Sequence, residues 1–262
     1  VHVANSVFSD SGSKYVANQA LAGGGLMLDG AEAELADVYF GSNFAGDEGG
    51  ALAVYNDTGL ELVRARFWEN GAASKGGAFL ARDMGDTPFL LLNNRFQDNE
   101  AADGGAVALV GSQISGLLGN STYAGNTASG AGGDVFAAAD ASTDGLYLWG
   151  SIHSHSGGGA AVHALESAGA SLFFNTCHSP DAACFDIPES AGAGLNSEAD
   201  PLFDAFSDDG NPQNDSLTLQ PGSPAIDAGP VDGSGPGYHI VWTDIDGTPN
   251  DQGYTGGPVS LE

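Results

Sequence analysis

Pairs of adjacent glycines recur along this chain at a nearly constant interval. Aligned on the second glycine of each pair, they fall 25, 27, 28, 28 and 26 residues apart, at Gly25, Gly50, Gly77, Gly105, Gly133 and Gly159. Glycine loses more backbone freedom on folding than any other residue, so a repeated pair needs a repeated structural reason. The interval predicts a stack of similar units, each laid on the one before it.

A short apolar run follows each glycine pair. The second position of the run is apolar in every unit: Met27, Leu52, Phe79, Val107, Val135 and Ala161. The runs are bounded by Gly, Asn, Asp and Ser, which is typical of strands and turns, and they are too short for a helical repeat. The sequence therefore predicts an all-β fold, a parallel β-solenoid of about seven coils with two or three short strands in each.

The other half of each unit contributes further columns. Aromatic residues recur at intervals of 27, 29 and 27, at Phe40, Phe67, Phe96 and Tyr123, and Phe8, Ile152 and Cys177 extend this column. An asparagine stands three residues after each of the four, at Asn43, Asn70, Asn99 and Asn126, and Ser11, His155 and Pro180 take the same place in the outer units. An apolar residue stands five residues before, at Val3, Leu35, Leu62, Leu91, Leu118, Tyr147 and Leu172. We expect an interior aromatic stack and an amide ladder. The alternative for each asparagine is a left-handed turn position.

The charge of the chain excludes several partners. With 34 acidic and 6 basic side chains the formal net charge is −28, whereas nucleic acids and anionic membranes require clustered Lys and Arg. Acidic glycans are also disfavoured, unless calcium bridges the two sets of carboxylates. No run of about 18 apolar residues is present, so the sequence predicts no membrane span.

Two cysteines, Cys177 and Cys184, stand seven residues apart in a loop-like segment, "CHSPDAAC". A disulfide between them would stabilise the fold by about 2.5 kcal/mol on the chain-entropy account. The alternative is two unrelated buried thiols. A disulfide favours an extracellular or cell-surface protein, and because residue 1 is Val we expect that a signal peptide has already been removed.

The repeats resemble those of bacterial surface proteins with a right-handed parallel β-helix. The glycine-glycine-alanine and Phe-x-x-Asn patterns are similar to repeats of polymorphic outer-membrane proteins, and "SPAIDAG" at residues 223–229 resembles a closing segment of secreted β-helix proteins. The resemblance implies a right-handed β-helix over residues 1–184 and an irregular capping or assembly segment over residues 185–262.

Enzymes of the β-helix class include polysaccharide lyases and hydrolases. A lyase of this kind needs a basic residue beside calcium-binding carboxylates; Arg64, Arg66 and Arg95 lie near one another in successive units, but no Asp cluster accompanies them. A hydrolase needs carboxylates on adjacent strands. Asp29, Asp83 and Asp134 fall on non-adjacent units. The sequence therefore favours a protein without catalytic activity.

Two loops could hold calcium. "DIDGTPND" offers Asp244, Asp246, Asn250 and Asp251, and "DAFSDDGNPQND" offers Asp204, Asp208, Asp209 and Asp215. Oxygen ligands around a glycine turn suit calcium, although the spacing to a final Glu of an EF-hand is missing. The alternative is a solvated acidic turn.

His153 and His155 alternate on one expected strand and could share zinc or copper. Alternatively, His155 replaces an asparagine of the ladder and His153 faces a turn.

These features predict an extracellular structural or adhesive β-helix. Open strands at the ends of a solenoid favour stacking, so we expect self-association in which residues 185–262 of one copy meet the first coil of the next, forming a filament. A cell-surface glycan is the other expected partner. The alternative function is polysaccharide binding or degradation in a groove lined by aromatic residues such as Tyr55, Trp68 and Trp149.

Overall fold

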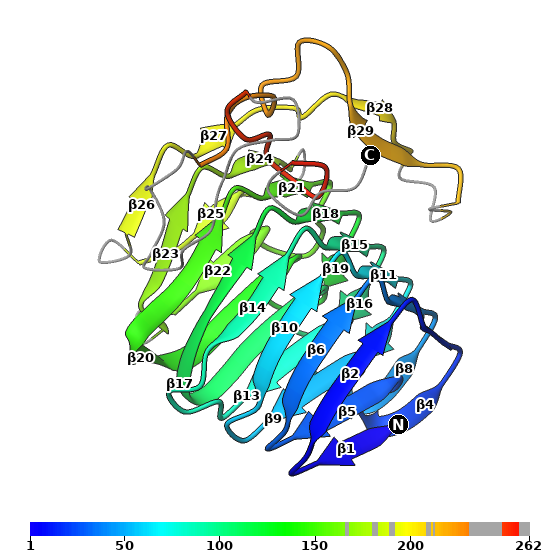
Figure 1. Cartoon of the computed structure of the whole chain (residues 1–262). Coiled ribbons are helices and arrows are strands. Elements are labelled where there is room, and N and C mark those ends of the chain that lie inside the picture. The colour runs from blue at the N-terminus through cyan, green and yellow to red at the C-terminus, as the bar shows by residue number, and fades with distance from the viewer. Residues whose placement is uncertain are drawn as a thin grey trace.

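The computed structural model describes residues 1–165, 168–179, 183–188, 192–207, 211, 213–230 and 248–256. Within these residues the named elements are all β-strands, which stack in parallel as a β-solenoid (Figure 1). The expected all-β solenoid is confirmed, and the predicted seven coils are close to the number of turns that the strands describe. No helix within the described residues is long and apolar enough to cross a membrane.

Each regular coil passes through three sheets, which we name A, B and C. Sheet A receives two strands per coil, on either side of a corner. The first set is β1 (His2–Ala4), β5 (Leu26–Asp29), β9 (Leu52–Tyr55), β13 (Phe79–Arg82), β22 (Val162–Ala164) and β25 (Phe185–Asp186). The second set is β2 (Val7–Ser11), β6 (Glu32–Ala36), β10 (Gly59–Val63), β14 (Phe89–Leu92), β23 (Ala170–Phe173) and β26 (Gly192–Gly194). Two long strands, β17 (Val107–Gly119) and β20 (Val135–Trp149), run through the corner and belong to both sets.

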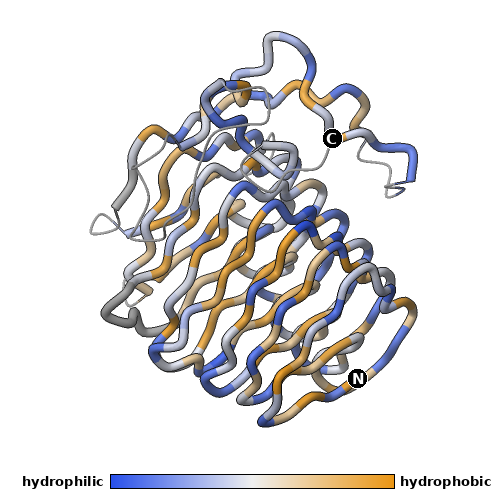
Figure 2. The backbone as a smooth tube through the Cα atoms, in the orientation of Figure 1, coloured by the Kyte–Doolittle hydropathy of each residue, from blue (hydrophilic) through white to orange (hydrophobic). Residues whose placement is uncertain are grey.

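Sheets B and C complete the coil. Sheet B contains β3 (Lys14–Val16), β7 (Tyr39–Gly41), β11 (Arg66–Trp68), β15 (Arg95–Gln97), β18 (Thr122–Ala124), β21 (Ile152–Ser154), β24 (Thr176–His178) and β27 (Ser197–Glu198). Sheet C contains β4 (Gln19–Ala22), β8 (Phe44–Glu48), β12 (Gly71–Ala72), β16 (Glu100–Ala101) and β19 (Thr127–Ala128). Apolar residues are concentrated in the strands, as Figure 2 shows. The central strands of sheet A are apolar at nearly every position, and alternate residues of each strand fill the interior.

The two positions of each glycine pair require glycine for different reasons. The first glycine of a pair is left-handed, with φ near +64° at Gly49, Gly76 and Gly104. The second lies against the backbone of the next coil: a Cβ on Gly50 would collide with the carbonyl oxygen of Gly77. Both demands recur in each regular coil, so the pair recurs.

Two of the glycine alignments were wrong by one residue. The strand registers pair Leu26, not Met27, with Leu52, and Val162, not Ala161, with Val135. Both errors fall at glycine triplets, residues 23–25 and 157–159, where two choices of pair exist and only the pairing of the strands decides between them.

The aromatic column lies in the interior of sheet B. Successive rings from Phe40 to Tyr123 are parallel, with centroids 4.8, 4.7 and 4.9 Å apart. Tyr15 and His153 extend the stack at 4.8 and 4.7 Å, so the expected end members Phe8 and Ile152 were wrong. Phe8 lies instead in sheet A opposite Ala33, and Ile152 faces outward, because alternation along β21 places His153 inside.

The asparagine column forms a hydrogen-bonded ladder. The side-chain oxygen of Asn70 accepts hydrogen bonds from the backbone N–H and the side-chain amide of Asn43, at 3.0 and 2.9 Å, and Asn99 and Asn126 repeat this pattern. The ladder begins at Asn18, not Ser11, and Ser156, not His155, takes the place after Asn126. Pro180 lies outside the described residues.

A second ladder was not predicted. It runs through Asn94, Ser121, Ser151, Asn175 and Asn196, at the corner between sheets A and B. Its mixed Asn and Ser composition hid it in the sequence, because either side chain can accept the same backbone N–H.

The coil continues beyond residue 184, since β25, β26 and β27 pair with β22, β23 and β24. The predicted boundary between residues 184 and 185 thus falls inside the last coil. The chain then forms the antiparallel pair β28 (Phe203–Ala205) and β29 (Ser216–Leu219). Phe203 and Leu217 pack against Ala124 and Ile152, so this segment covers the outer side of sheet B.

Candidate functional site

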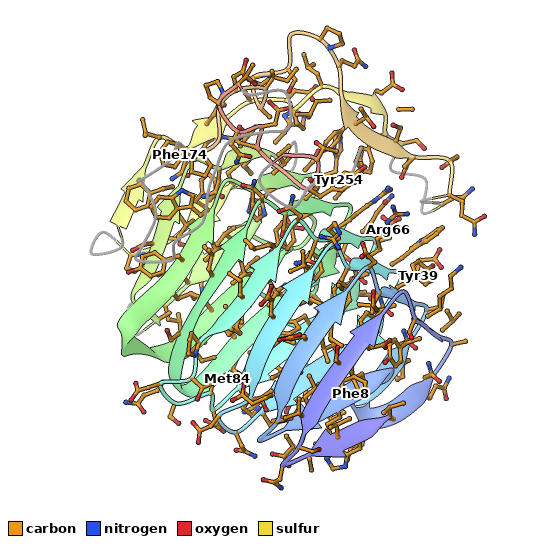
Figure 3. The ribbon with its side chains drawn as sticks, in the orientation of Figure 1. Phe8, Tyr39, Arg66, Met84, Phe174 and Tyr254 are labelled. Atoms are coloured by element: carbon orange, nitrogen blue, oxygen red, sulfur yellow. A yellow bond between two sulfur atoms is a disulfide. The ribbon has the colours of Figure 1, made fainter. Side chains whose placement is uncertain are left out.

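The outer side of sheet B carries a group of cationic and aromatic side chains. Because Tyr15, Phe40, Phe67 and Phe96 point inward, their strand neighbours point outward. These outward residues are Lys14, Tyr39, Arg66, Trp68, Arg95 and Gln97, which we call the cationic face. Figure 3 shows Tyr39 and Arg66 on one side of the ribbon. Three of the six basic residues of a chain with net charge −28 are thus gathered on four neighbouring strands.

Tyr39 and Trp68 form the aromatic part of this face. The Tyr39 ring lies across Gly41, where a Cβ would collide with it. Its centroid is 6.0 Å from that of Trp68, at an interplanar angle of 89°, and Lys14 Nζ lies 6.0 Å from the Tyr39 ring. Burial, and the nearby Glu69 carboxylate to a smaller degree, raise the pKa of the Tyr39 phenol, which therefore stays a neutral donor.

Arg66 and Arg95 are direct neighbours in the strand register. Like charges in this arrangement repel. Burial lowers the pKa of Arg95, and the charge of Arg66 lowers it further. Arg95 donates to the side-chain oxygen of Gln97 through two of its nitrogens. Arg66 is exposed, and no described carboxylate forms an ion pair with it.

Asp37, an acid that interacts electrostatically with Arg66, is already engaged in an ion pair. Asp37 binds Arg64 through both carboxylate oxygens, at 2.8 and 2.7 Å. Those hydrogen bonds are the main cause of a lowered pKa at Asp37, to which Arg66 makes only a small contribution. Arg66 therefore retains a positive charge and donors that an external anion can use.

The described residues of the C-terminal segment cover one half of sheet B and do not extend over the other half. Gln97 donates to the carboxylate of Asp215, and the ring of Tyr254 lies 6.0 Å from the Arg95 guanidinium. The Tyr254 backbone N–H donates to Thr122 Oγ1 at 3.0 Å. The face thus binds a carboxylate and an aromatic ring of its own chain at β15 and β18, while Lys14 and Arg66 stay exposed on β3 and β11.

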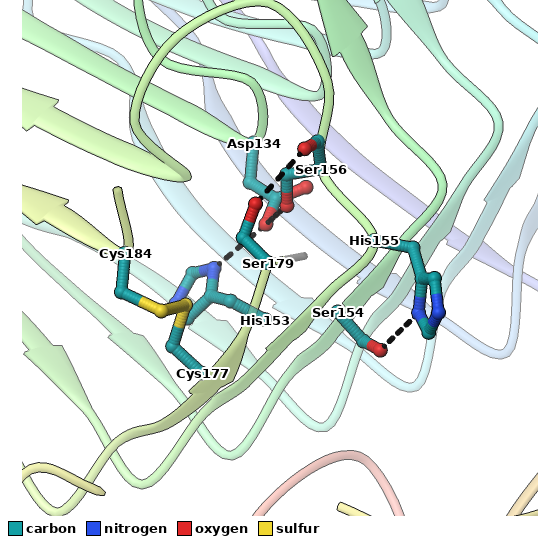
Figure 4. The surroundings of a disulfide bond; sticks show 8 residues. All are labelled: Asp134, His153, Ser154, His155, Ser156, Cys177, Ser179 and Cys184. Atoms are coloured by element: carbon teal, nitrogen blue, oxygen red, sulfur yellow. Dashed lines mark hydrogen bonds and ion pairs between the residues drawn. A yellow bond between two sulfur atoms is a disulfide. The ribbon is translucent and has the colours of Figure 1, made fainter. Parts of the chain in front are cut away.

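A polar cluster lies in the interior near the disulfide (Figure 4). The Asp134 carboxylate accepts hydrogen bonds from Asn126 at 2.9 Å and from Ser156 at 2.5 Å, and lies 3.0 Å from His153 Nδ1. Asp134 and His153 are both 0% exposed. The cluster resembles a catalytic constellation in composition, but no substrate can reach it. It ends the asparagine ladder and the aromatic stack.

The expected disulfide between Cys177 and Cys184 is present. It stands beside a recess of about 340 Å³ lined by residues that include His178, Phe185 and Glu198. Cys177 follows His153 in the register of sheet B and continues the interior column.

The structure separates the histidines that were expected to share a metal. His153 points into the core, whereas His155 lies at a left-handed corner with φ +55° and its ring is 5.4 Å from that of His178. His163 is paired with Asp186 at 2.7 Å. Within the described residues no three His, Cys, Asp or Glu side chains are grouped to hold a metal ion.

Only some of the residues predicted to bind calcium lie among the described residues. Asp244 and Asp246 lie outside the described residues, as do Asp208 and Asp209. Asn250 is buried and exchanges two hydrogen bonds with Asn120, both 3.1 Å, and Asp251 accepts the backbone N–H of Asp227 at 2.8 Å. Asp204 is exposed on β28, whereas Asp215 lies against Gln97. Calcium binding stays a prediction.

Other expected surface residues do not join the cationic face. Tyr55 and Arg82, at the ends of β9 and β13 in sheet A, both donate to Glu48 at the end of β8. Trp149 is buried in a cluster with Leu92 and Leu117. Of the three aromatic residues expected to line a groove, only Trp68 lies on this face. Tyr39 and Lys14 were missed because they belong to no repeating column. Only the position of Tyr39 directly before Phe40 marks it as an outward neighbour, and Lys14 precedes Tyr15, which the sequence analysis did not assign to the aromatic column.

No protein-family model, curated protein or solved structure matches this chain.

Proposed function

We propose that this chain is a non-enzymatic extracellular β-solenoid that serves as a structural and adhesive module, and that it binds surface glycans through the cationic face. The observation that carries the proposal is the unneutralised Arg66 beside Arg95, Tyr39 and Trp68 on an otherwise acidic chain. Aromatic rings stack on the apolar faces of sugars, and a guanidinium binds a carboxylate through two parallel hydrogen bonds. The resemblance of the repeats to bacterial surface proteins supports the same location.

The net charge of the chain limits which kinds of glycan it can bind. A net charge of −28 repels a densely charged polyanion at long range. Arg66 nevertheless favours a single acidic group close to it. We therefore expect a glycan whose acidic groups are isolated among neutral sugars, with one sugar ring on Tyr39 and the acidic group on Arg66.

The basic residues that could serve a lyase are engaged elsewhere. Arg64 is bound to Asp37, and Arg82 is bound to Glu48, where Tyr55 shares the same carboxylate. These contacts support structural roles for both arginines, and they support binding rather than bond cleavage as the function of the surface.

The test compares three probes at 0.15 M salt by titration calorimetry. These are xylan oligosaccharides with isolated glucuronic acid groups, the same oligosaccharides without them, and polygalacturonate. We expect binding of the first, weaker binding of the second, and least of the third. Arg66→Gln should weaken binding of the first probe by about tenfold, since it removes a charged hydrogen bond.

Arg64→Gln is the matched control. It removes the same charge two residues away in the sequence, from a residue whose carboxylate partner lies within the chain. We expect less than about a twofold effect on binding. Equal losses for Arg64→Gln and Arg66→Gln, or no binding of the glucuronic acid probe, would refute the proposal.

A further inference from the structure

Both ends of the solenoid carry strands whose outer edge is unpaired among the described residues. At one end these are β1, β2, β3 and β4, and at the other β25, β26 and β27. Apolar side chains are exposed at both ends, with Val7 84%, Leu21 75% and Leu195 73% exposed. The two edges of a parallel sheet carry complementary N–H and C=O groups, so the last coil can pair with a first coil.

We propose that a second copy of this chain docks end to end, with β25, β26 and β27 of one copy against β1, β2 and β3 of the next. The register follows from the columns already present. Phe136 pairs with His163 and His163 with Asp186 at one end of sheet A, and Met27 pairs with His2 at the other. Continuing this column by one coil places His2 of the next copy directly after Asp186.

The hydrogen-bonding groups at this position are complementary. Asp186 Oδ2 is bound to His163 Nδ1 at 2.7 Å, and the Asp186 side chain is 66% exposed. Its second oxygen accepts no hydrogen bond within the described residues. An imidazole of His2 from the next copy would donate to that oxygen, so that the carboxylate stands between two histidines.

The corner between sheets A and B has the same backbone conformation in the last coil as in the first coil. Leu195 and Gly12 occupy the same left-handed corner position of the last and first coils, with φ +57° and +73°. Inside the solenoid the backbone N–H of Asn94 donates to Ser121 Oγ of the following coil at 3.2 Å. Asn196 and Ser13 stand in the same relation at the junction, so the backbone N–H of Asn196 would donate to Ser13 Oγ.

Two carboxylates limit the strength of the junction. Glu198 follows Cys177 in the interior column of sheet B, which brings it onto Tyr15 of the next copy. Asp10 accepts the hydroxyl groups of Tyr15 and Ser13 and would lie close to Glu198. Repulsion between these two acids makes the association weak, and removing one of the charges strengthens it.

Sedimentation velocity over roughly 1–200 µM at 0.15 M salt tests the register. We expect concentration-dependent association that Glu198→Gln tightens by about fivefold and that His2→Asp or Asp186→His weakens by about fivefold, the range of an exposed ion pair. The double variant His2→Asp with Asp186→His exchanges the two partners and should restore association.

Thermal unfolding of each variant checks that the fold is kept, and Arg66→Gln, which alters only the cationic face, should associate like the unmodified chain. Monomeric sedimentation of both the unmodified chain and Glu198→Gln would overturn the proposal. So would failure of the double variant to recover. Neither result bears on glycan binding, which is measured on other residues.

Discussion

The same strands make both faces of sheet B, but residue types repeat from coil to coil on the inner face and vary from coil to coil on the outer face. On the inner face the chemistry repeats, with rings from Tyr15 to His153 stacked at 4.7 to 4.9 Å. On the outer face the corresponding positions carry Lys14, Tyr39, Arg66, Arg95 and Thr122, which share no common chemistry along the row. Identical groups complete each other's contacts inside, and no such demand acts outside. The outer face is therefore where recognition can be encoded.

At one position of the inner aromatic column a polar imidazole replaces an apolar ring, and a buried carboxylate lies beside it. His153 replaces an aromatic ring, and Asp134 supplies the partner that an imidazole needs in the core. Ser156 and Asn126 bind the same carboxylate. The buried Asp134 carboxylate thus has three polar partners, whereas His153 Nε2 has no hydrogen-bond partner among the described residues.

Removing the Asp134 carboxylate should have the largest effect on the packing of the inner face. Asp134→Ala leaves the donors of His153, Ser156 and Asn126 without their acceptor in a dry interior. We expect a loss of about 3–5 kcal/mol in the free energy of unfolding, measured by chemical denaturation. Glu61→Ala is the control, because Glu61 faces outward beside Glu34 and like charges in this position repel. Equal effects of the two variants would contradict the distinction between the faces.

The ladder should show a smaller effect of the same kind. Asn70 is 1% exposed, and its side chain joins Asn43, Asn99 and the carbonyl group of Phe40. Asn70→Ala leaves buried groups unpaired, so we expect a loss of about 2–3 kcal/mol in a denaturant titration.

The neighbouring Glu69→Asn is the matched control for the ladder. Glu69 is exposed and left-handed, with φ +50°, a conformation that Asn tolerates. We expect this change to stay within about 0.5 kcal/mol. A loss for Glu69→Asn as large as that for Asn70→Ala would mean that the corner, and not the ladder, stabilises the coil.

The difference between the repeating inner face and the non-repeating outer face also explains which features could be predicted from the sequence. Phe40, Phe67, Phe96 and Tyr123, with the asparagines after them, keep fixed spacing because stacking demands it. The sequence therefore predicted the fold, the aromatic stack and the asparagine ladder that follows these rings. At the outer coils the spacing alone chose Phe8 over Tyr15 and Ile152 over His153. Those choices depend on which strand pairs with which, and that information is not local.

The cationic face could be predicted only in part. Arg66 and Arg95 were found as a pair in successive units, yet their ring neighbour Tyr39 was not, because non-repeating residues leave no periodic signal. The separation of Arg64 from Arg66 also required the structure. The two are two residues apart in sequence, but one is bound to Asp37 and the other is exposed.

The smallest expected effect belongs to the outer ion pair of Asp37 and Arg64. The Arg64 hydrogen bonds lower the pKa of Asp37 below its unfolded value of about 3.9. Since the folded pKa is the lower one, the pair stabilises the fold fully above the unfolded pKa, and this contribution is lost as the pH falls through the folded pKa. Thermal unfolding of Asp37→Asn and the unmodified chain should differ at pH 6 and converge near pH 3. Because both side chains are partly exposed to solvent, which screens the pair, the difference at pH 6 should stay below about 0.5 kcal/mol. A loss comparable to that of Asn70→Ala would show that an outer pair can stabilise this solenoid as strongly as a rung of its ladder.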